Sequence, residues 1–445
     1  MTVAKTTQLP ARASGHTEYL DDERELLAAS VGYRERLLLV IAGLFMVVIQ
    51  GGLIAARGLS ILEYWHTAIW VMCAVLGYLV LRRRLPCRDP FLFPAVMLLA
   101  GWGLTLIDRL APPFATRQTA WLAISVAALL AIASLPGHLR WLRRYRYLWL
   151  ISGLGMLIMT IVIGTNPSGG GPRLWLGIPD VYFQPSELLK VLLLAFLASY
   201  LADNRALLDL DRMHIGPLRI PPLRFLAPIL LMWGISVLVL VWQKDLGTAT
   251  LFFVVFLAML YLASGEISYV LEGGALLVVA GIEAYRLFDV VRLRLTVWWD
   301  PWSYAKQDAF QIVQSLLAFS AGGVFGQGVG QGSPTYIPVV HSDFVFAAVG
   351  EEWGLLGTLV VTTVLGLLVM RGMQIAARSQ DRPFRAYLAA GISITLAAQC
   401  LLIIGGVLKI IPLTGITLPF LSYGGSSLLA YFLMMGLLIV LSGEA

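Results

Sequence analysis

The sequence predicts an all-α polytopic membrane protein with about twelve transmembrane helices. Hydrophobic residues make up 58% and charged residues 13% of the 445 positions, whereas soluble domains carry about 25% charged residues. The apolar residues gather in runs of about 20, the length that a helix needs to cross roughly 30 Å of hydrocarbon. Strict polar–apolar alternation, the pattern of a membrane β-barrel, does not occur along the sequence.

Twelve apolar segments supply these helices, because a spanning segment must satisfy its backbone hydrogen bonds internally. We expect spans near 37–56, 62–81, 91–107, 118–135, 147–164, 185–202, 224–242, 248–263, 268–288, 344–370, 385–408 and 426–442. The first two, within residues 37–90, precede a ten-helix core at 91–445. Residues 1–36 form a polar cytosolic tail that we expect to be disordered.

Arginine placement predicts the orientation of the spans. Four even-numbered connections are rich in arginine, with Arg82, Arg83, Arg84 and Arg88 in the second, Arg140, Arg143, Arg144 and Arg146 in the fourth, Arg205, Arg212, Arg219 and Arg224 in the sixth, and Arg371, Arg378, Arg382 and Arg385 in the tenth. Because basic residues stay on the cytoplasmic side, we expect these connections and both chain termini in the cytosol. The net charge of +6 is therefore a topology signal, and nucleic acid is not an expected partner.

Two odd-numbered connections stand out on the outer side. One covers residues 165–184, and the longest, between the ninth and tenth spans, covers 289–343. Loops as long as 289–343 are usually functional or disordered. The 289–343 loop is not of low complexity. Tryptophans around Pro301 suit a membrane interface, and apolar residues at helical spacing predict an amphipathic helix over 304–320.

Charges within or beside spans mark candidate functional residues, because an ionisable residue costs at least ~2.5 kcal/mol at the bilayer centre. Glu187 and Lys190 are three residues apart, so they share one helix face; they either serve a site or only neutralise each other. Asp245 lies between two spans on the outer side, in a site or in a solvated turn. His341 is a lone histidine and the three cysteines are widely spaced, so the sequence indicates no particular metal.

Four segments together resemble one known family. Phe183–Lys190 resembles the F-Q-P-S-E-x-x-K motif of the SEDS proteins (shape, elongation, division and sporulation), the RodA/FtsW/SpoVE family. Gln243–Thr248 resembles their Q-P-D-L-G-T, and His341–Glu352 their H-T/S-D-F-I-F-A…E-E. Leu413–Ser427 resembles the terminal P-x-T-G-x-x-L-P-F-x-S-Y-G-G-S-S. The motifs occur in the family's order, and the resemblance covers about residues 91–445.

The resemblance implies a peptidoglycan glycosyltransferase of the bacterial cytoplasmic membrane that polymerises lipid II on the outer leaflet. Such proteins serve elongation, division or sporulation, contact membrane lipid, and work beside a class B penicillin-binding transpeptidase. A sugar hydroxyl then attacks an anomeric carbon that bears a lipid diphosphate. A carboxylate takes the proton, and cationic side chains or a divalent cation (Mg²⁺ or Mn²⁺) stabilise the diphosphate.

The residues that suit this chemistry fall into two groups. The catalytic candidates are Asp245, Glu187 and Lys190. The candidates for substrate binding are Arg294, Arg173, Gln311, Gln314, Ser315, His341, Asp343 and Ser422.

One position departs from the family's pattern. The long loop matches around Arg294 and Asp300, but the position of the family's catalytic aspartate is Tyr304. Tyrosine, with a reference pKa near 10, is a poor base at neutral pH. Asp308 could replace that carboxylate if 304–320 is helical, and Asp300 could do so from before the proline. A second departure is Lys244, which stands where the family has proline.

Three functions therefore compete. The first is a lipid II polymerase. The second is a catalytically degenerate scaffold that binds a transpeptidase, because of Tyr304. The third is a lipid-precursor flippase, since buried charge pairs and twelve spans are also typical of transporters.

Overall fold

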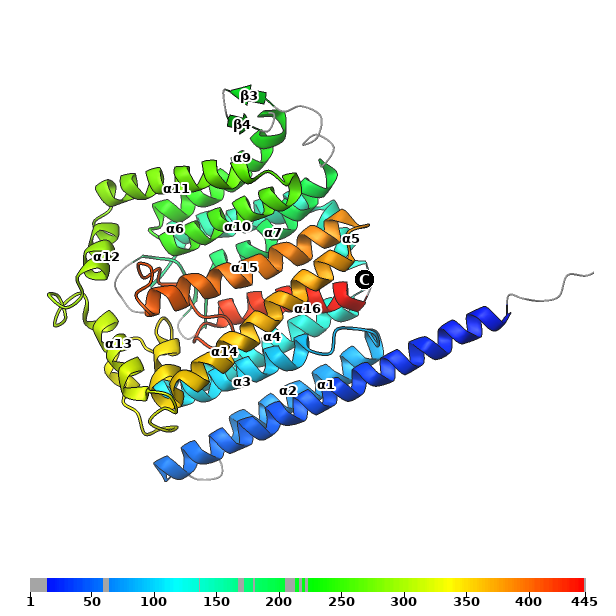
Figure 1. Ribbon diagram of the computed structural model, residues 1–445, viewed down its shortest axis with the longest axis horizontal. Coiled ribbons are helices and arrows are strands. Elements are labelled where there is room, and N and C mark those ends of the chain that lie inside the picture. The colour runs from blue at the N-terminus through cyan, green and yellow to red at the C-terminus, as the bar shows by residue number, and fades with distance from the viewer. Residues whose placement is uncertain are drawn as a thin grey trace, which may run out of the picture.

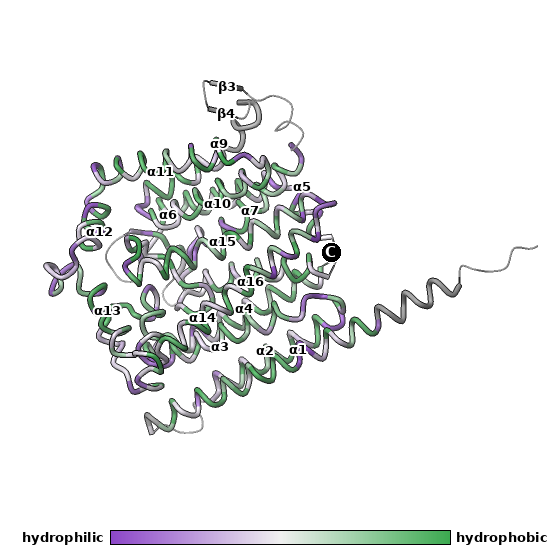
Figure 2. Tube along the Cα trace, viewed as in Figure 1, coloured by the Kyte–Doolittle hydropathy of each residue, from purple (hydrophilic) through white to green (hydrophobic). Residues whose placement is uncertain are grey.

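The computed structural model describes residues 14–443, except 59–63, 136, 167–171, 179–180, 205–212, 216–217 and 221–222. Long helices lie side by side in one bundle, with shorter helices across one end (Figure 1). Hydrophobic residues follow the lengths of the bundle helices, and hydrophilic stretches concentrate in the connections (Figure 2). The expected all-α polytopic fold is therefore confirmed.

The helices are α1 (Ser14–Arg57), α2 (Trp65–Arg84), α3 (Leu92–Leu110), α4 (Pro112–Ser134), α5 (His138–Arg144), α6 (Arg146–Ile163), α7 (Pro185–Asp203), α9 (Leu223–Trp242), α10 (Leu246–Ser264), α11 (Ile267–Leu287), α12 (Asp289–Trp299), α13 (Phe310–Gly322), α14 (Val345–Arg378), α15 (Pro383–Val407) and α16 (Gly425–Gly443), with a 3₁₀ turn η2 (Pro334–Tyr336). Eleven helices in the described part of the chain are long and apolar enough to cross a membrane. The seventh expected span, 224–242, coincides with α9, whose part Trp233–Trp242 is a shorter apolar helix.

Two antiparallel hairpins within the described segments were not expected. Strands β1 (Leu176–Ile178) and β2 (Val181–Phe183) pair directly before α7. Strands β3 (Met213–Ile215) and β4 (Leu218–Ile220) pair before α9. Each strand has only three residues, too few for an alternating pattern to stand out in the sequence.

The N-terminal segment differs from the expectation of a disordered tail. Helix α1 begins at Ser14, so residues 14–36 are helical, while 1–13 lie outside the described residues. The end of this segment is anchored by a buried ion pair: Glu35 and Arg88 are both fully buried, and Arg88 Nε donates to Glu35 Oε1 at 3.2 Å. Helix α1 is thus tied to the connection between α2 and α3.

The centre of the bundle is formed by α3 and α7, each 89% buried along its spanning window. Helix α16 packs against α4, α3 and α7, and α15 packs against α14, α7 and α10. Helix α11 is only 11% buried, so it lies on the lipid-facing rim. This arrangement brings the polar residues of α7, α15 and α16 into the interior.

The two ends of the bundle carry different segments. Helices α12 and α13 lie across one end, and α5 and the C-terminus lie at the other (Figure 1). Arginines of the fourth and tenth connections, including Arg140 and Arg382, line one cavity at that second end. Arg205 and Arg212 of the sixth connection lie outside the described residues. The basic connections that can be placed are therefore opposite the long loop, as the positive-inside pattern predicts.

Candidate active site

Asp245 caps the start of α10 at the end of the bundle where α12 lies. Its Oδ1 accepts a hydrogen bond from the Thr248 amide at 3.2 Å, while its Oδ2 is buried and has no hydrogen-bond partner in the described part of the chain. The pKa of the Asp245 carboxyl is raised, because the effect of burial exceeds that of the Thr248 hydrogen bonds, which lower it. This geometry excludes a solvated turn and leaves one carboxylate oxygen available to a ligand.

The turn before Asp245 accounts for one departure from the family's motif. Lys244 is exposed and has a φ of 60°. Proline is fixed near −65°, so it could not occupy this backbone conformation. At the other side of Asp245, a Cβ on Gly247 would lie 2.4 Å from the Thr414 carbonyl oxygen. The glycine is therefore required where α10 meets the loop before α16.

Arg294 of α12 reaches the same loop from the opposite side. Its Nη1 donates to the Thr414 carbonyl at 3.1 Å. Gly415 has a φ of 72°, and a Cβ there would lie 3.2 Å from Arg294 Nη2 and 3.9 Å from Asp343 Oδ2. Burial lowers the pKa of Arg294, whereas the carboxylates of Asp343 and Asp245 raise it. A guanidinium is thus held by the Thr414 carbonyl and feels the charges of two carboxylates.

The Asp343 carboxylate is partly buried. Ser342 Oγ donates to Asp343 Oδ1 at 2.9 Å. Burial raises the pKa of Asp343, against this hydrogen bond and the charge of Arg294, which lower it. The charges of Asp343 and Arg294 therefore stabilise each other.

A largely apolar cavity of about 510 Å³ opens beside these groups. It lies between α10, α11, α12 and the loop before α16, and its lining residues are Leu246, Gly247, Thr250, Val278, Gly281, Ile282, Tyr285, Val291, Arg294, Leu295, Pro412, Leu413 and Thr414. The Thr414 hydroxyl is buried without a hydrogen-bond partner in the described segments. An apolar cavity with few convergent polar groups is typical of ligand sites, and this one suits an apolar chain with an anionic end.

Glu187 and Lys190 form a buried network in the first turn of α7. Lys190 Nζ lies 2.6 Å from Glu187 Oε2, and the two side chains are 2% and 9% exposed. Lys190 also donates to Gln399 Oε1 at 2.9 Å, and Tyr431 Oη donates to the same oxygen at 2.6 Å. Gln399 Nε2 in turn donates to the Thr417 carbonyl at 2.8 Å. The pair therefore braces the loop that carries Thr414 and Gly415.

This network also acts on Asp245 through its charges. Glu187 raises the pKa of the Asp245 carboxyl, and Lys190 lowers it. Glu187 and Lys190 belong to one sequence motif and Asp245 to another, more than 50 residues away. The fold brings them close enough for the charges of Glu187 and Lys190 to act on the Asp245 carboxyl. Gln399 and Tyr431 were not predicted from the sequence. For Gln399, the available signal was a polar side chain within an apolar run.

The loop positions considered for the missing catalytic carboxylate lie outside the cluster of Asp245 and Arg294; they are Asp300, Tyr304 and Asp308. Helix α13 begins at Phe310 rather than near 304, so the expected helix over 304–320 is wrong at its start, and residues 301–309 form turns. Asp308 is exposed in these turns and does not stand one helical turn beyond Tyr304. Asp300 and Tyr304 instead line one cavity of about 400 Å³ with Trp299. Hydrogen bonds from Ser303 lower the pKa of Asp300.

Several other candidates hold segments together. Gln311 Nε2 donates to the Pro338 carbonyl at 3.3 Å, and Ser315 Oγ donates to the Val407 carbonyl at 3.1 Å. Ser422 Oγ accepts from the Leu418 amide at 2.9 Å and donates to the Ser342 carbonyl. These contacts fix α13 and the turn before α16 around the cluster.

The remaining candidates are more peripheral. His341 packs against Phe114, with ring centroids 5.1 Å apart, and against Tyr423, at 5.8 Å; burial lowers the pKa of His341. Gln314 is half-buried on α13, and Arg173 is exposed before β1.

A second polar cluster fixes the loop that follows α13. Arg109 of α3 pairs with Glu352 of α14 at 3.2 Å and donates to the Gly332 carbonyl at 3.0 Å. Helix α14 is broken at Gly354, where φ is 66° and a Cβ would lie 2.4 Å from the Gly326 amide nitrogen. Neither Arg109 nor this break in α14 was predicted from the sequence. For Glu352, the available signal was an ionisable residue within an apolar span, which marks a candidate functional position.

The described residues contain no group of three or more His, Cys, Asp and Glu side chains that could hold a metal ion. Magnesium commonly takes one or two carboxylates and completes its shell with phosphates and water. The cluster around Arg294 supplies two carboxylates, Asp245 and Asp343, so one can meet an ion while the other stays free.

Comparison with known proteins agrees with the motifs. The family model of FtsW, RodA and SpoVE, described as cell cycle proteins, matches residues 91–445. The peptidoglycan glycosyltransferase RodA of Mycobacterium leprae is 39% identical over 379 residues, covering 83% of this chain and 81% of the relative. The stage V sporulation protein E of Bacillus subtilis is 33% identical over 332 residues, 74% of this chain and 87% of the relative.

A solved structure of a peptidoglycan synthase complex contains a chain of similar fold. Its TM-score is 0.66 at 26% identity, and the match covers 80% of this chain and 98% of that one. A family model that spans residues 91–445, together with the RodA relative, identifies the chain as a multi-pass bacterial membrane protein. The chain belongs to the FtsW, RodA and SpoVE family.

Proposed function

We propose that this protein is a peptidoglycan glycosyltransferase that polymerises lipid II at the end of the bundle carrying α12 and α13. One observation carries the proposal: the buried Oδ2 of Asp245 has no partner among the described residues, and Asp245 directly precedes Leu246 and Gly247, which line an apolar cavity of about 510 Å³ together with Arg294. The family's relatives that bear the name peptidoglycan glycosyltransferase support the same activity.

In this proposal Asp245 is the general base. It takes the proton of the attacking sugar hydroxyl, whose oxygen forms the new glycosidic bond to the anomeric carbon. The bond from that carbon to the lipid diphosphate breaks, and the diphosphate leaves with its polyprenyl chain. A raised carboxyl pKa suits this role, since a stronger base accepts the proton more readily near neutral pH.

Arg294 stabilises the leaving diphosphate. A guanidinium matches phosphate oxygens through paired N–H donors, and Arg294 is held in place by its hydrogen bond to the Thr414 carbonyl. The apolar cavity takes the first part of the polyprenyl chain. Glu187 and Lys190 are positioning residues, because they brace the loop through Gln399 and adjust the charge at Asp245.

A divalent cation is the expected cofactor. Asp343 would hold Mg²⁺ or Mn²⁺ together with the diphosphate, which leaves the free oxygen of Asp245 to act as the base, and the ion would neutralise charge on the leaving group. Polymer formation should then fall on chelation and return with added cation, while full activity in chelator would remove the cation from the proposal.

The partner is proposed to be a class B penicillin-binding transpeptidase. A similar chain is found in a peptidoglycan synthase complex that coordinates polymerization and crosslinking. The arginine-rich end and both termini are proposed to face the cytosol, so that the cleft at Arg294 opens to the outer leaflet, where the transpeptidase also acts.

Glycan formation from labelled lipid II by the full-length protein in vesicles tests the function. Long glycan strands are expected. Transfer of lipid across the bilayer without polymer would instead favour the flippase. No polymer from the wild type, even with the transpeptidase present, would favour the scaffold that Tyr304 suggests.

A further inference from the structure

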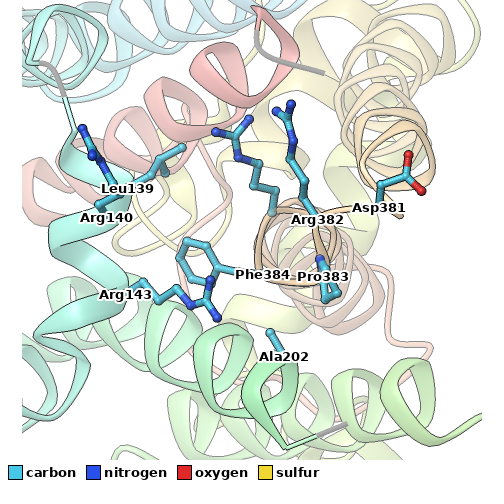
Figure 3. A pocket seen from close by; sticks show the side chains of 9 residues that line it. Leu139, Arg140, Arg143, Ala202, Asp381, Arg382, Pro383 and Phe384 are labelled. Atoms are coloured by element: carbon cyan, nitrogen blue, oxygen red, sulfur yellow. The ribbon is translucent and has the colours of Figure 1, made fainter. Parts of the chain in front are cut away.

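A basic cavity lies at the end of the bundle opposite Asp245. It has a volume of about 390 Å³ and is lined by Leu139, Arg140, Arg143, Ala202, Asp381, Arg382, Pro383, Phe384 and Arg385. Figure 3 shows Arg140 and Arg143 on one wall and Arg382 and Phe384 on the other. The four arginines come from α5 and from the start of α15, which are far apart in the sequence.

A second cavity of about 460 Å³ lies beside the first. That cavity shares Arg140 and Arg143 and adds Arg144, Arg146, Tyr147 and Asp203. Together the two cavities are lined by six arginines and two aspartates. The excess of guanidinium groups favours an anion, and phosphate oxygens match the arginine fork.

The wall of the cavity is braced by Arg143. Its Nη2 lies 2.5 Å from Asp203 Oδ1 at the end of α7, and its guanidinium carbon lies 5.9 Å from the centre of the Phe384 ring. These contacts join α5, α7 and α15. The neighbouring Arg140 is an exposed residue of α5 and contributes charge without this bracing.

Backbone and side chains favour an anion at the same place. Helix α15 begins at Pro383, so the positive end of its dipole meets the cavity that Arg382 and Phe384 line. The arginines supply the specific donors. Charge and dipole therefore have the same sign at this cavity.

The position of the cavity relative to the membrane surface indicates whether its phosphate belongs to a lipid headgroup or to a soluble ion. Exposed aromatic residues Trp141, Tyr145, Tyr147 and Trp149 lie on α5, α6 and the residue between them, and aromatic rings of this kind mark the membrane–water interface. The apolar side chains of Leu139 and Phe384 add a wall that glycerol and the upper acyl carbons can contact. A lipid headgroup thus fits better than a soluble ion.

We propose that this arginine cavity binds the phosphate of an anionic membrane phospholipid on the cytosolic side. Basic pockets between transmembrane helices at this depth commonly hold such headgroups. The proposal is independent of the glycosyltransferase chemistry, since none of these residues belongs to the cluster around Asp245.

The test compares lipid retention by the full-length protein in nanodiscs of phosphatidylcholine with a minority of phosphatidylglycerol, read by native mass spectrometry. The wild type should retain phosphatidylglycerol over phosphatidylcholine. The double variant Arg140→Gln/Arg385→Gln should lose about 10- to 30-fold of that preference, because it removes two guanidinium donors from the cavity and charge-assisted hydrogen bonds to phosphate are strong.

Arg82→Gln/Arg83→Gln is the matched control, because it removes the same amount of charge. These two exposed arginines lie in the last turn of α2 and do not line the cavity. The preference of this control variant should stay unchanged. An equal loss in both variants, or no loss in the cavity variant, would overturn the proposal. Arg140→Gln alone, at an exposed position, repeats the test if the double variant fails to fold.

Inorganic phosphate separates the two sources of the anion. Millimolar phosphate should leave bound phosphatidylglycerol in place. If phosphate displaces the lipid completely and binds equally well in phosphatidylcholine nanodiscs, the cavity is a soluble-phosphate site and the lipid assignment is wrong.

Discussion

The Lys190 ammonium lies 2.6 Å from the Glu187 carboxylate in the first turn of α7, and both side chains are buried. Removal of one partner from such a pair leaves an uncompensated charge, which typically costs 3–5 kcal/mol, whereas removal of both is often tolerated. The pair therefore constrains how the site can be altered.

We expect Lys190→Met to lower the free energy of unfolding by about 3–5 kcal/mol. Glu187→Gln/Lys190→Met should recover much of that loss, because no lone charge remains. Unfolding by denaturant in detergent micelles measures both. A double variant as unstable as Lys190→Met would show that the Gln399 and Tyr431 contacts, rather than the charge balance, dominate.

Replacement of Arg294 should impair catalysis more than folding. Arg294→Ala should lower kcat/KM about 10²- to 10³-fold, the usual cost of losing a donor to a developing charge. Arg294→Lys should recover part of the rate, since it keeps the charge but not the planar fork. Arg292→Ala on the same helix, where the side chain is 50% exposed, is the control and should stay within about twofold of the wild type. Equal losses for the two positions would exclude a specific role for Arg294.

Gly415→Ala separates backbone strain from damage to the site. Gly415 and Gly265 have φ values of 72° and 71°, so alanine costs about 1–2 kcal/mol at either position. Only at Gly415 would the new methyl group lie 3.2 Å from Arg294 Nη2, because nothing lies within 4 Å at Gly265. Thermal unfolding should fall similarly in both variants, and polymerisation only in Gly415→Ala. Equal activity in the two would contradict the contact between Gly415 and Arg294.

The raised pKa of Asp245 predicts opposite effects of pH on activity and stability. The base must be ionised, so polymerisation should fall on acidification at a pH above the ordinary aspartate pKa of about 3.9. Its folded-state pKa lies above the unfolded value, so its contribution to stability is complete below the unfolded pKa and is lost as pH rises through the folded pKa. Asp245→Asn should remove that loss from the unfolding profile. An acid limb at the ordinary pKa would contradict the burial of the carboxyl.

Much of this account could be predicted from the sequence, because its signals are local. The apolar runs predict the bundle, and the motifs around Glu187, Lys190 and Asp245 identify three residues that the fold brings into one charged region. The turn at Lys244 and the helix start at Phe310 could not be predicted, since they depend on how α10 and α13 pack. Arg109 and Glu352 are 243 residues apart, and no local pattern links them.

The start of α1 illustrates a different limit. A polar, charged N-terminal segment indicates disorder when taken alone, but Glu35 has a buried partner in Arg88. Such pairing is a tertiary effect that composition does not report.

The most direct test of the account is single-turnover glycan formation from lipid II by Asp245→Asn, with lipid II binding measured in parallel. The account predicts a loss of about 10²- to 10⁴-fold in rate, the range for a lost general base, with binding retained. Asp300→Asn and Asp308→Asn, at exposed positions of the long loop, serve as matched carboxylate controls and should remain active. A fully active Asp245→Asn, with Asp300→Asn or Asp308→Asn inactive, would contradict the account and move the base to the loop beside Tyr304.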